Sequence, residues 1–239
     1  MLIVKNTPNN TGVSISGDYE DLNELYLALH DIVGEEGEFI GYDSSRIRVL
    51  GVCYDLRHAF MGHRSIELVD NGMNEQKMLE NSTIVSKKNV YYKVEVLWTE
   101  VLFVFMVLND FIALSGDKLK NRQWDKSVAV TRKFQSMIIS ELKNILKATT
   151  FTRLENCMAR NSGYFRYYFT QYIDVLNIRF LKMSKDKKLK NISIMGKRIA
   201  EKGDEYQNLK ANIIDKAKEY NCHPSELIVS SDYPEEIDW

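Results

Sequence analysis

The feature that most constrains the fold is a change of hydrophobic period near the middle of the chain. From about residue 125 onward, apolar side chains recur every three or four residues, as on one face of an α-helix. Three such stripes cover residues 130–146, 165–183 and 206–220, and the next strand-like pattern comes at 227–229. Because strand-like patterns precede this helical part, the sequence predicts an α+β fold with a helical C-terminal half.

The first half of the chain mixes helix and strand patterns. Asp18 can accept hydrogen bonds from the first turn of a helix, which we expect to run to about residue 33. Further helices are predicted at 52–61, closed by Gly62, and at 98–114. Alternating apolar residues predict strands that would form one small mixed or antiparallel sheet. The predicted strands are residues 11–16, 46–50, 65–69 and 90–98.

The length of the chain bounds its organisation. It has 239 residues, 44% of them hydrophobic, which is enough to bury a core without disulfides or metal ions. Only three prolines interrupt it, so a long flexible linker is not expected. We expect a sheet-containing part over residues 1–120 and a helical part over 121–239, packed together as one compact unit. The acidic residues 230–239 are expected to be loosely held.

The cysteines and the most apolar segment indicate in which cellular compartment we expect the protein. Cys53, Cys157 and Cys222 form no CxxC pair, so we expect reduced thiols in a cytoplasmic protein without a metal centre or a cofactor. The start of the chain lacks the pattern of a signal peptide. The most apolar segment, 94–114, is free of polar residues only over 101–108, well short of the roughly 20 residues that a membrane span needs. We therefore predict a buried helix and no membrane segment.

The net charge of −1 conceals a strong segmentation along the chain. Residues 1–100 carry a net charge of −7, residues 101–202 carry +12, and residues 203–239 carry −6. One interpretation is that these parts neutralise one another in the fold. The other is that some of the basic surface in residues 153–202 faces an anionic partner, either a protein or a nucleic acid. The oligomeric state is left open.

One polar cluster could support catalysis. If residues 53–58 are helical, Asp55 and His58 lie three residues apart on one face, where a carboxylate could orient an imidazole as a base. Arg57 and Arg64 could then hold an anionic substrate. The alternative interpretation is a structural cluster or a surface that binds a partner.

The basic part of the chain supplies candidate binding residues. Arg153 and Arg160 would share one face of a helix, and Arg166 follows among tyrosines. Arginines mixed with tyrosines can hold phosphates and stack on bases, but they can equally pair with the acidic N-terminal half. The lysine-rich run over 179–202 contains nine Lys and Arg against two acids. Its central candidates for contact with a polyanion are Lys187, Lys188 and Lys190.

Short motifs of common enzymes are absent from the sequence. It contains no GxGxxG, GxxxxGK[ST], HExxH or GxSxG, which argues against a common nucleotide-dependent or zinc enzyme. The segments VKNTPNNTGVSISGDYEDL, RVLGVCYDLRHAFMG, VDNGM and NVYYKVEVLW, within residues 2–110, resemble an uncharacterised family of Firmicutes-type bacterial proteins, a domain of unknown function. The resemblance implies a bacterial cytoplasmic setting and a recurrent YDLRH helix, and it assigns no activity.

These observations favour a non-catalytic binding or regulatory protein. It would engage a protein or nucleic-acid partner through the basic helical half and the region from Arg57 to Arg64. The alternative is a hydrolase that acts on a phosphorylated or nucleic-acid substrate with Asp55, His58 and nearby arginines, which would require a deep pocket converging on them. A second alternative is an oligomeric scaffold that associates through an exposed part of the aromatic stripes.

Overall fold

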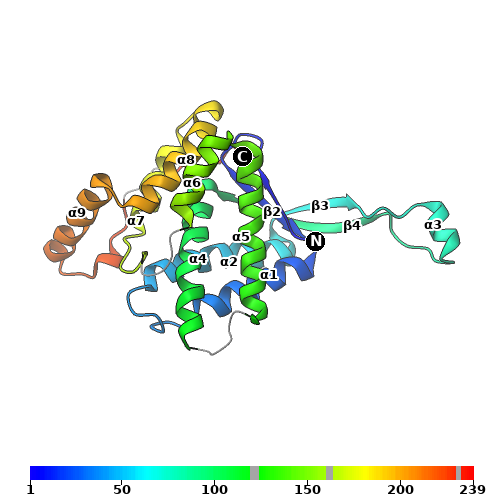
Figure 1. The fold of residues 1–239 in the computed structure, drawn as a ribbon, viewed down its shortest axis with the longest axis horizontal. Helices are drawn as coiled ribbons and strands as arrows, with labels where there is room; N and C mark the ends of the chain where they lie inside the picture. The colour runs from blue at the N-terminus through cyan, green and yellow to red at the C-terminus, as the bar shows by residue number, and fades with distance from the viewer. Residues whose placement is uncertain (119–123, 160–163, 230–232) are drawn as a thin grey trace.

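A four-stranded sheet organises the N-terminal half of the protein in this computed structural model, which describes residues 1–118, 124–159, 164–229 and 233–239. The order is β1-β2-β4-β3, and every neighbouring pair is antiparallel. Helices follow the sheet along the chain, so the predicted α+β class is confirmed (Figure 1). The strands are β1 (Ile3–Asn6), β2 (Gly12–Gly17), β3 (Ser65–Asp70) and β4 (Lys88–Leu97).

One face of this sheet carries the β-branched residues that form the core. Val13 pairs with Val96 and Ile15 pairs with Val94, so all four side chains lie on the same face, and all four are buried. The predicted strands at 11–16, 65–69 and 90–98 are confirmed. β1 was not predicted, because its four residues are too few to show an alternating pattern.

The predicted strand at 46–50 is wrong. Residues from Asp43 to His58 form one continuous helix, α2, which follows α1 (Tyr19–Val33). The buried residues of α2 include Val49, Val52 and Leu56, whose spacing is helical, so the period extends further toward the N-terminus than the sequence suggested. Asp18 caps α1 as predicted, since its Oδ1 accepts a hydrogen bond of 2.9 Å from the Asp21 N–H.

Helices make up most of the second half of the described chain. The stripe over 165–183 is helical only in part, because Phe165 and Tyr168 lie in the turn before its helix. Residues 227–229 form no strand. The helices are α4 (Trp98–Lys118), α5 (Lys126–Ile145), α6 (Ala148–Met158), α7 (Gln171–Leu181), α8 (Lys185–Glu201), α9 (Asp204–Tyr220) and the 3₁₀ turn η3 (Pro224–Glu226).

Helix α4 is the central helix of the core, and the sheet, α1, α5, α7 and α8 all contact it. Its segment Trp98–Gly116 is long and apolar enough to cross a membrane by length and composition, but 72% of the 18-residue window is buried inside the protein. The prediction of a buried helix at this position is therefore confirmed. One hydrophobic cluster runs through both parts of the chain, from Leu2 to Tyr206.

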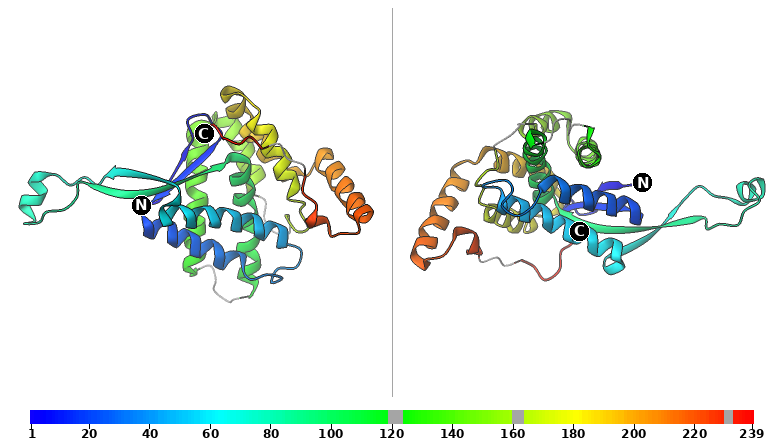
Figure 2. Two further views of the ribbon diagram at one scale, coloured as in Figure 1. Left: turned by 180° about the vertical axis from the view of Figure 1, so that it is seen from behind. Right: turned by 90° about the horizontal axis from the view of Figure 1, so that it is seen from below.

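A long hairpin projects from the side of the molecule (Figures 1 and 2). It consists of β3, the short helix α3 (Glu75–Glu80) and the outer part of β4. We call residues 65–93 the arm. The arm leaves the body just after the π-helical turn η1 (Ala59–His63), which continues directly from α2.

The segment 233–239 is held against the turn between β1 and β2, contrary to the expectation of a loose end. The Thr11 hydroxyl donates a 2.6 Å hydrogen bond to the carbonyl oxygen of Asp238, and the Asn9 side chain donates one of the same length to the Asp238 carboxylate. The Asn9 N–H also donates to the carbonyl oxygen of Trp239. The acidic composition misled the prediction, because most of these contacts use backbone groups, which the sequence does not display.

Candidate functional site

The polar cluster that the sequence singles out lies where the chain turns back at the end of α2. Gly62 has a φ of 82°, in the left-handed region that glycine adopts without steric cost. This turn places Arg64 beside α2, with its Nη2 2.9 Å from Oδ1 of Asp55. It also brings His63 next to His58, with 3.2 Å between the two Nδ1 atoms. The turn η1 therefore assembles the cluster as much as α2 does.

Asp55 and His58 are not paired with each other in the way that a general base would require. Asp55 accepts from Arg64, and the ring of His58 lies between His63 and Tyr54, whose ring centroid is 4.2 Å away. Partial burial lowers the pKa of His58, and the positive side chains around it act in the same direction. At neutral pH the imidazole is thus uncharged, and its nearest hydrogen-bonding partner is another imidazole.

A groove of about 750 Å³ lies beside this cluster, between α2, β4 and the 233–239 segment. Asp55 and Arg64 line it, together with Arg48 and Glu100 from deeper in the fold. Among the described residues, neither His58 nor Arg57 is part of its lining, and Arg57 instead lies over the Tyr54 ring at 5.6 Å. The groove therefore includes Asp55 and Arg64 of the hydrolase hypothesis, but it does not bring His58 and Arg57 together with them.

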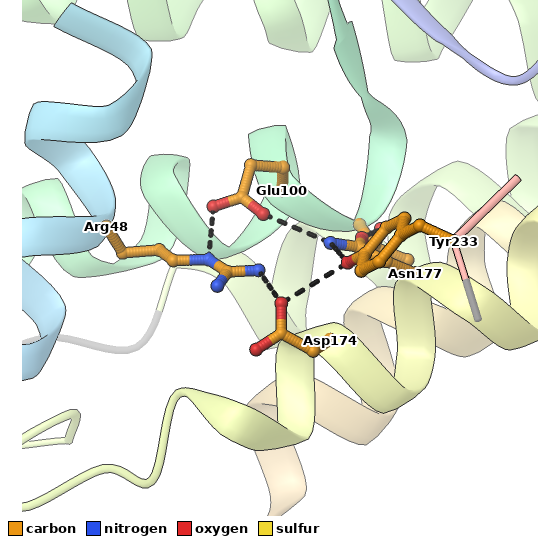
Figure 3. A network of polar contacts seen from close by, with 6 residues as sticks. Arg48, Glu100, Asp174, Asn177 and Tyr233 are labelled. Carbon is orange, nitrogen blue, oxygen red and sulfur yellow. Dashed lines mark hydrogen bonds and ion pairs between the residues drawn. The ribbon is translucent and has the colours of Figure 1, made fainter. Parts of the chain in front are cut away.

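A polar network centred on Arg48 begins at the groove and extends to residues beyond its lining (Figure 3). The Nε of Arg48 lies 2.7 Å from Glu100, and its Nη2 lies 2.8 Å from Asp174. Asn177 donates to Glu100 at 3.2 Å, and the Tyr233 hydroxyl donates to Asp174 at the same distance. This network connects α2, α4, α7 and the 233–239 segment, and sequence inspection did not single out any of its members as a site.

The electrostatics of this network indicate a structural role. Burial alone would lower the pKa of the Arg48 guanidinium, but the carboxylates of Glu100 and Asp174 outweigh that effect and raise it. Burial raises the pKa of the Tyr233 hydroxyl to about 12. The arginine is permanently charged and engaged by two carboxylates, so it joins the elements of the fold.

The buried cysteine and the described acidic side chains concern two further kinds of reactive centre, a nucleophile and a metal-binding group. Burial raises the pKa of the Cys53 thiol to about 12, so it is protonated and inert at neutral pH. Within the described ranges, no group of three or more His, Cys, Asp or Glu side chains is placed to hold a metal ion.

A different site appears at the end of the helical half where α5 finishes and α8 begins. Asn6 donates its backbone N–H to Glu141 of α5, and Asn10 donates its side-chain amide to the carbonyl oxygen of Lys185. The turn between β1 and β2 therefore joins these two helix ends, which lie together at the top of Figure 1. α6 begins two residues after α5 and packs along α8, and α7 ends just before α8 begins.

Six exposed lysines occupy these four helix ends, and we call them the basic pole. Among the described residues, no carboxylate lies within 4.0 Å of any of their ammonium groups. Asp186, in the first turn of α8, is the acid nearest to them in sequence. The basic pole comprises Lys143, Lys147, Lys182, Lys185, Lys187 and Lys190.

The sequence-predicted binding residues are only partly in this site. Lys187 and Lys190 belong to it, and Arg153 is exposed nearby on α6. Lys188 does not, since it is buried and donates a 2.7 Å hydrogen bond to the Thr11 hydroxyl. Burial lowers the pKa of Lys188, and the charge of Asp238 acts in the opposite direction.

The aromatic residues around Arg166 are divided between the core and the surface, since Tyr167 is exposed. Phe165 and Tyr168 are buried, and the guanidinium of Arg166 lies 5.0 Å from the ring centroid of Tyr167. Arg160 lies outside the described residues.

Comparisons with known proteins give one match. A family model described as a domain of unknown function (DUF6904) matches residues 2–239. No curated protein and no solved structure matches the chain. The resemblance noted over residues 2–110 thus extends through the helical half, while a bacterial, Firmicutes-type origin stays a prediction.

Proposed function

We propose that this chain, which belongs to the DUF6904 family of unknown function, is a non-catalytic binding protein that contacts the phosphate backbone of a nucleic acid through its basic pole. The observation that carries this proposal is the gathering of six exposed lysines, from four helix ends, with no carboxylate of the described residues within ion-pair distance. Unpaired cations clustered on one surface attract a polyanion, because binding releases its condensed counterions.

The rest of the basic segment contrasts with the pole. Arg179 and Arg198 both lie within ion-pair distance of Glu205 in the acidic C-terminal part, and Lys126 pairs with Glu24 in the acidic N-terminal part. The fold therefore neutralises some of the positive charge of the middle segment internally. The lysines of the pole remain turned toward solvent, as do Lys133, Arg153 and Arg166 elsewhere in this segment, and the pole is where several of them come from neighbouring helix ends.

Two helix N-termini support phosphate binding at the same surface. The residue before α6 is Lys147, and the residue before α8 is Ser184; neither side chain caps the first turn of its helix. The N–H groups of a first helical turn attract anions through hydrogen bonding and through the helix dipole. A phosphate at the pole would thus meet backbone donors as well as ammonium groups.

The composition of the pole favours contact with the backbone of a duplex over the bases of a single strand. The segments that carry its lysines, residues 143–150 and 182–190, contain no aromatic residue, whereas proteins that bind single strands stack bases on aromatic rings. Lysine is a point charge that contacts phosphate without reading sequence. We therefore expect binding that does not depend on sequence and that weakens steeply with salt.

The test is fluorescence anisotropy with a short random-sequence duplex, as DNA and as RNA, over a series of salt concentrations. If all six lysines contact phosphates, the slope of log K against log salt is about −5. The triple variant Lys185→Glu, Lys187→Glu, Lys190→Glu should bind about tenfold or more weakly, with a shallower slope. If the wild type shows no detectable duplex binding, the proposal is wrong, and an acidic protein becomes the better candidate for the partner.

A matched control reverses three exposed lysines elsewhere: Lys88→Glu, Lys216→Glu, Lys218→Glu. It changes the net charge of the protein by the same amount, so it should retain most of the affinity if the pole is the site. Equal losses in the two triple variants would mean that net charge alone drives binding. A salt-independent affinity would contradict the proposal outright.

The hydrolase alternative has weaker support. It needs Asp55, His58 and Arg57 to face one pocket, whereas the groove is lined by Asp55 without the other two. The scaffold alternative, in its original form, relied on exposed aromatic stripes, and the largest members of those stripes, such as Phe165 and Tyr172, are buried.

A further inference from the structure

We propose that the arm, residues 65–93, binds the arm of a second copy of this chain. This inference is independent of the basic pole and of the proposed function. It concerns the part of the molecule that projects furthest from the body (Figure 2).

The arm lacks the support that the rest of the sheet has. β2 ends at Gly17, which lies opposite Tyr92, so the residues of β4 before Tyr92 pair with β3 alone. α3 contributes no buried residue. A two-stranded ribbon by itself is marginally stable in water, because it buries too little apolar surface. A second surface packed against the arm would supply that burial.

One face of the arm is an uncovered continuation of the core. Val94 is buried on the inner face of the sheet, and alternation along β4 puts Val90 on the same face. The register places Leu68 opposite Val90, and Ile66 opposite Tyr92, so these side chains share that face. Ile66, Leu68 and Val90 are exposed. Adjacent exposed apolar side chains of this kind mark interaction surfaces.

The charge of the arm suits an identical partner. Residues 65–93 contain four acids and four lysines, so their net charge is zero. Two of the lysines are already paired within the arm, Lys93 with Glu67 and Lys87 with Glu75. A neutral arm does not repel its own copy, and one apolar face can meet the same face of a second copy across a twofold axis. An anionic partner would be attracted to the basic pole instead.

The tip of the arm carries further exposed apolar side chains. A stable interface buries about 800 Å² on each partner, so the contact would need the tip of the arm as well as the exposed apolar residues near its base. Those at the tip are Leu79, Ile84 and Val85.

The experiment is light scattering coupled to size-exclusion chromatography of the full chain at micromolar concentration. The wild type should elute with twice the 27.8 kDa mass of the chain. The variant Leu68→Lys should elute as a monomer, because a lysine placed in an apolar interface loses its hydration without gaining a partner. Leu27→Lys is the matched control, since Leu27 on α1 is 56% exposed and Leu68 is 62% exposed. It should stay a dimer.

Val90→Lys tests the same face from the other strand and should also give a monomer. Circular dichroism of each variant checks that its helical content is unchanged. A monomeric wild type would overturn the proposal, and so would a dimer that persists in both Leu68→Lys and Val90→Lys. Loss of the dimer in Leu27→Lys would place the interface elsewhere and overturn the assignment to the arm.

Discussion

Arg48 allows the reasoning about the groove network to be tested quantitatively, because one guanidinium contacts carboxylates from two other helices. Its side chain is 21% exposed, and it lies 2.7 Å from Glu100 and 2.8 Å from Asp174. Removing one partner of a buried ion pair costs about 3–5 kcal/mol, since a charge is left desolvated and unpaired. These carboxylates keep some contact with water, so the lower end of that range applies to Arg48→Met.

The expected loss is therefore about 3 kcal/mol, which corresponds to a fall in Tm of about 10 °C for a chain of this size. The assay is thermal and urea unfolding followed by circular dichroism. Arg64→Met is the matched control, because Arg64 is 42% exposed and forms one ion pair with Asp55. An exposed pair contributes about 0–1 kcal/mol, so this variant should melt close to the wild type.

A further variant separates the loss of the Arg48 ion pairs from the cost of leaving the two carboxylates unpaired. Replacing Glu100 and Asp174 by their amides in the Arg48→Met background removes the unpaired carboxylates, so part of the lost stability should return. If Arg48→Met unfolds no more easily than Arg64→Met, the network does not hold these elements together, and the structural role argued for Arg48 is wrong.

Three further predictions concern two glycines of the backbone and the histidine cluster. Gly12→Ala should destabilise the fold by about 3 kcal/mol in urea unfolding, because the new Cβ would lie 2.1 Å from the carbonyl oxygen of Val96. Gly51→Ala, with open space around it in α2, should stabilise by about 0.8 kcal/mol. In an NMR titration His58 should show a pKa below 6.5, rising in His63→Gln because a neighbouring positive charge is removed. Since the folded pKa of His58 is lowered, its contribution to stability is complete above pH 6.5 and is lost as the pH falls through the folded value.

The parts of the fold that local chemistry determines were predictable from the sequence. Asp18 carries a capping carboxylate directly before an apolar stripe, and the helix begins there. The apolar run inside α4 is interrupted by Asn109 and Asp110, which argued for a buried helix, and both residues form hydrogen bonds inside the protein, although Oδ1 of Asp110 is buried without a partner among the described residues. The Asp110 carboxylate accepts from the Tyr42 hydroxyl at 3.0 Å, and the Asn109 amide donates to the carbonyl oxygen of Met158.

The elements that were predicted wrongly or missed depend on contacts between distant parts of the chain. Residues 46–50 were predicted as a strand because Ile47 and Leu50 are apolar, although the two do not alternate with period two, and in the structure Ile47 is exposed while Val49 faces the core. Only the neighbours of α2 decide which of these residues is buried. β1 shows no local signal because it is held by its register with β2, for example Val4 opposite Ile15.

The basic pole, as the structure places it, could be predicted only in part. The excess of lysine over 179–202 indicated the lysines at the start of α8, whereas Lys143 and Lys147 join the basic pole only because α5 ends beside the start of α8. Contacts through the turn between β1 and β2 create that juxtaposition, at sequence separations of more than a hundred residues. A count of charges along the chain cannot show it.

Lys188 was predicted as an exposed binding residue, but the helical period of α8 places it on the buried face. α8 buries Lys188, Ile192, Met195 and Ile199, which follow one another at intervals of four, three and four residues. This is the period of a helix face, so a helical phase applied to the lysine-rich run would have placed Lys188 inside and Lys187 and Lys190 outside. The buried ammonium group of Lys188 donates a hydrogen bond to the Thr11 hydroxyl, and this hydroxyl in turn donates to the carbonyl oxygen of Asp238. The lysine therefore holds the 233–239 segment against the turn between β1 and β2 from within, while its neighbours in sequence face the solvent.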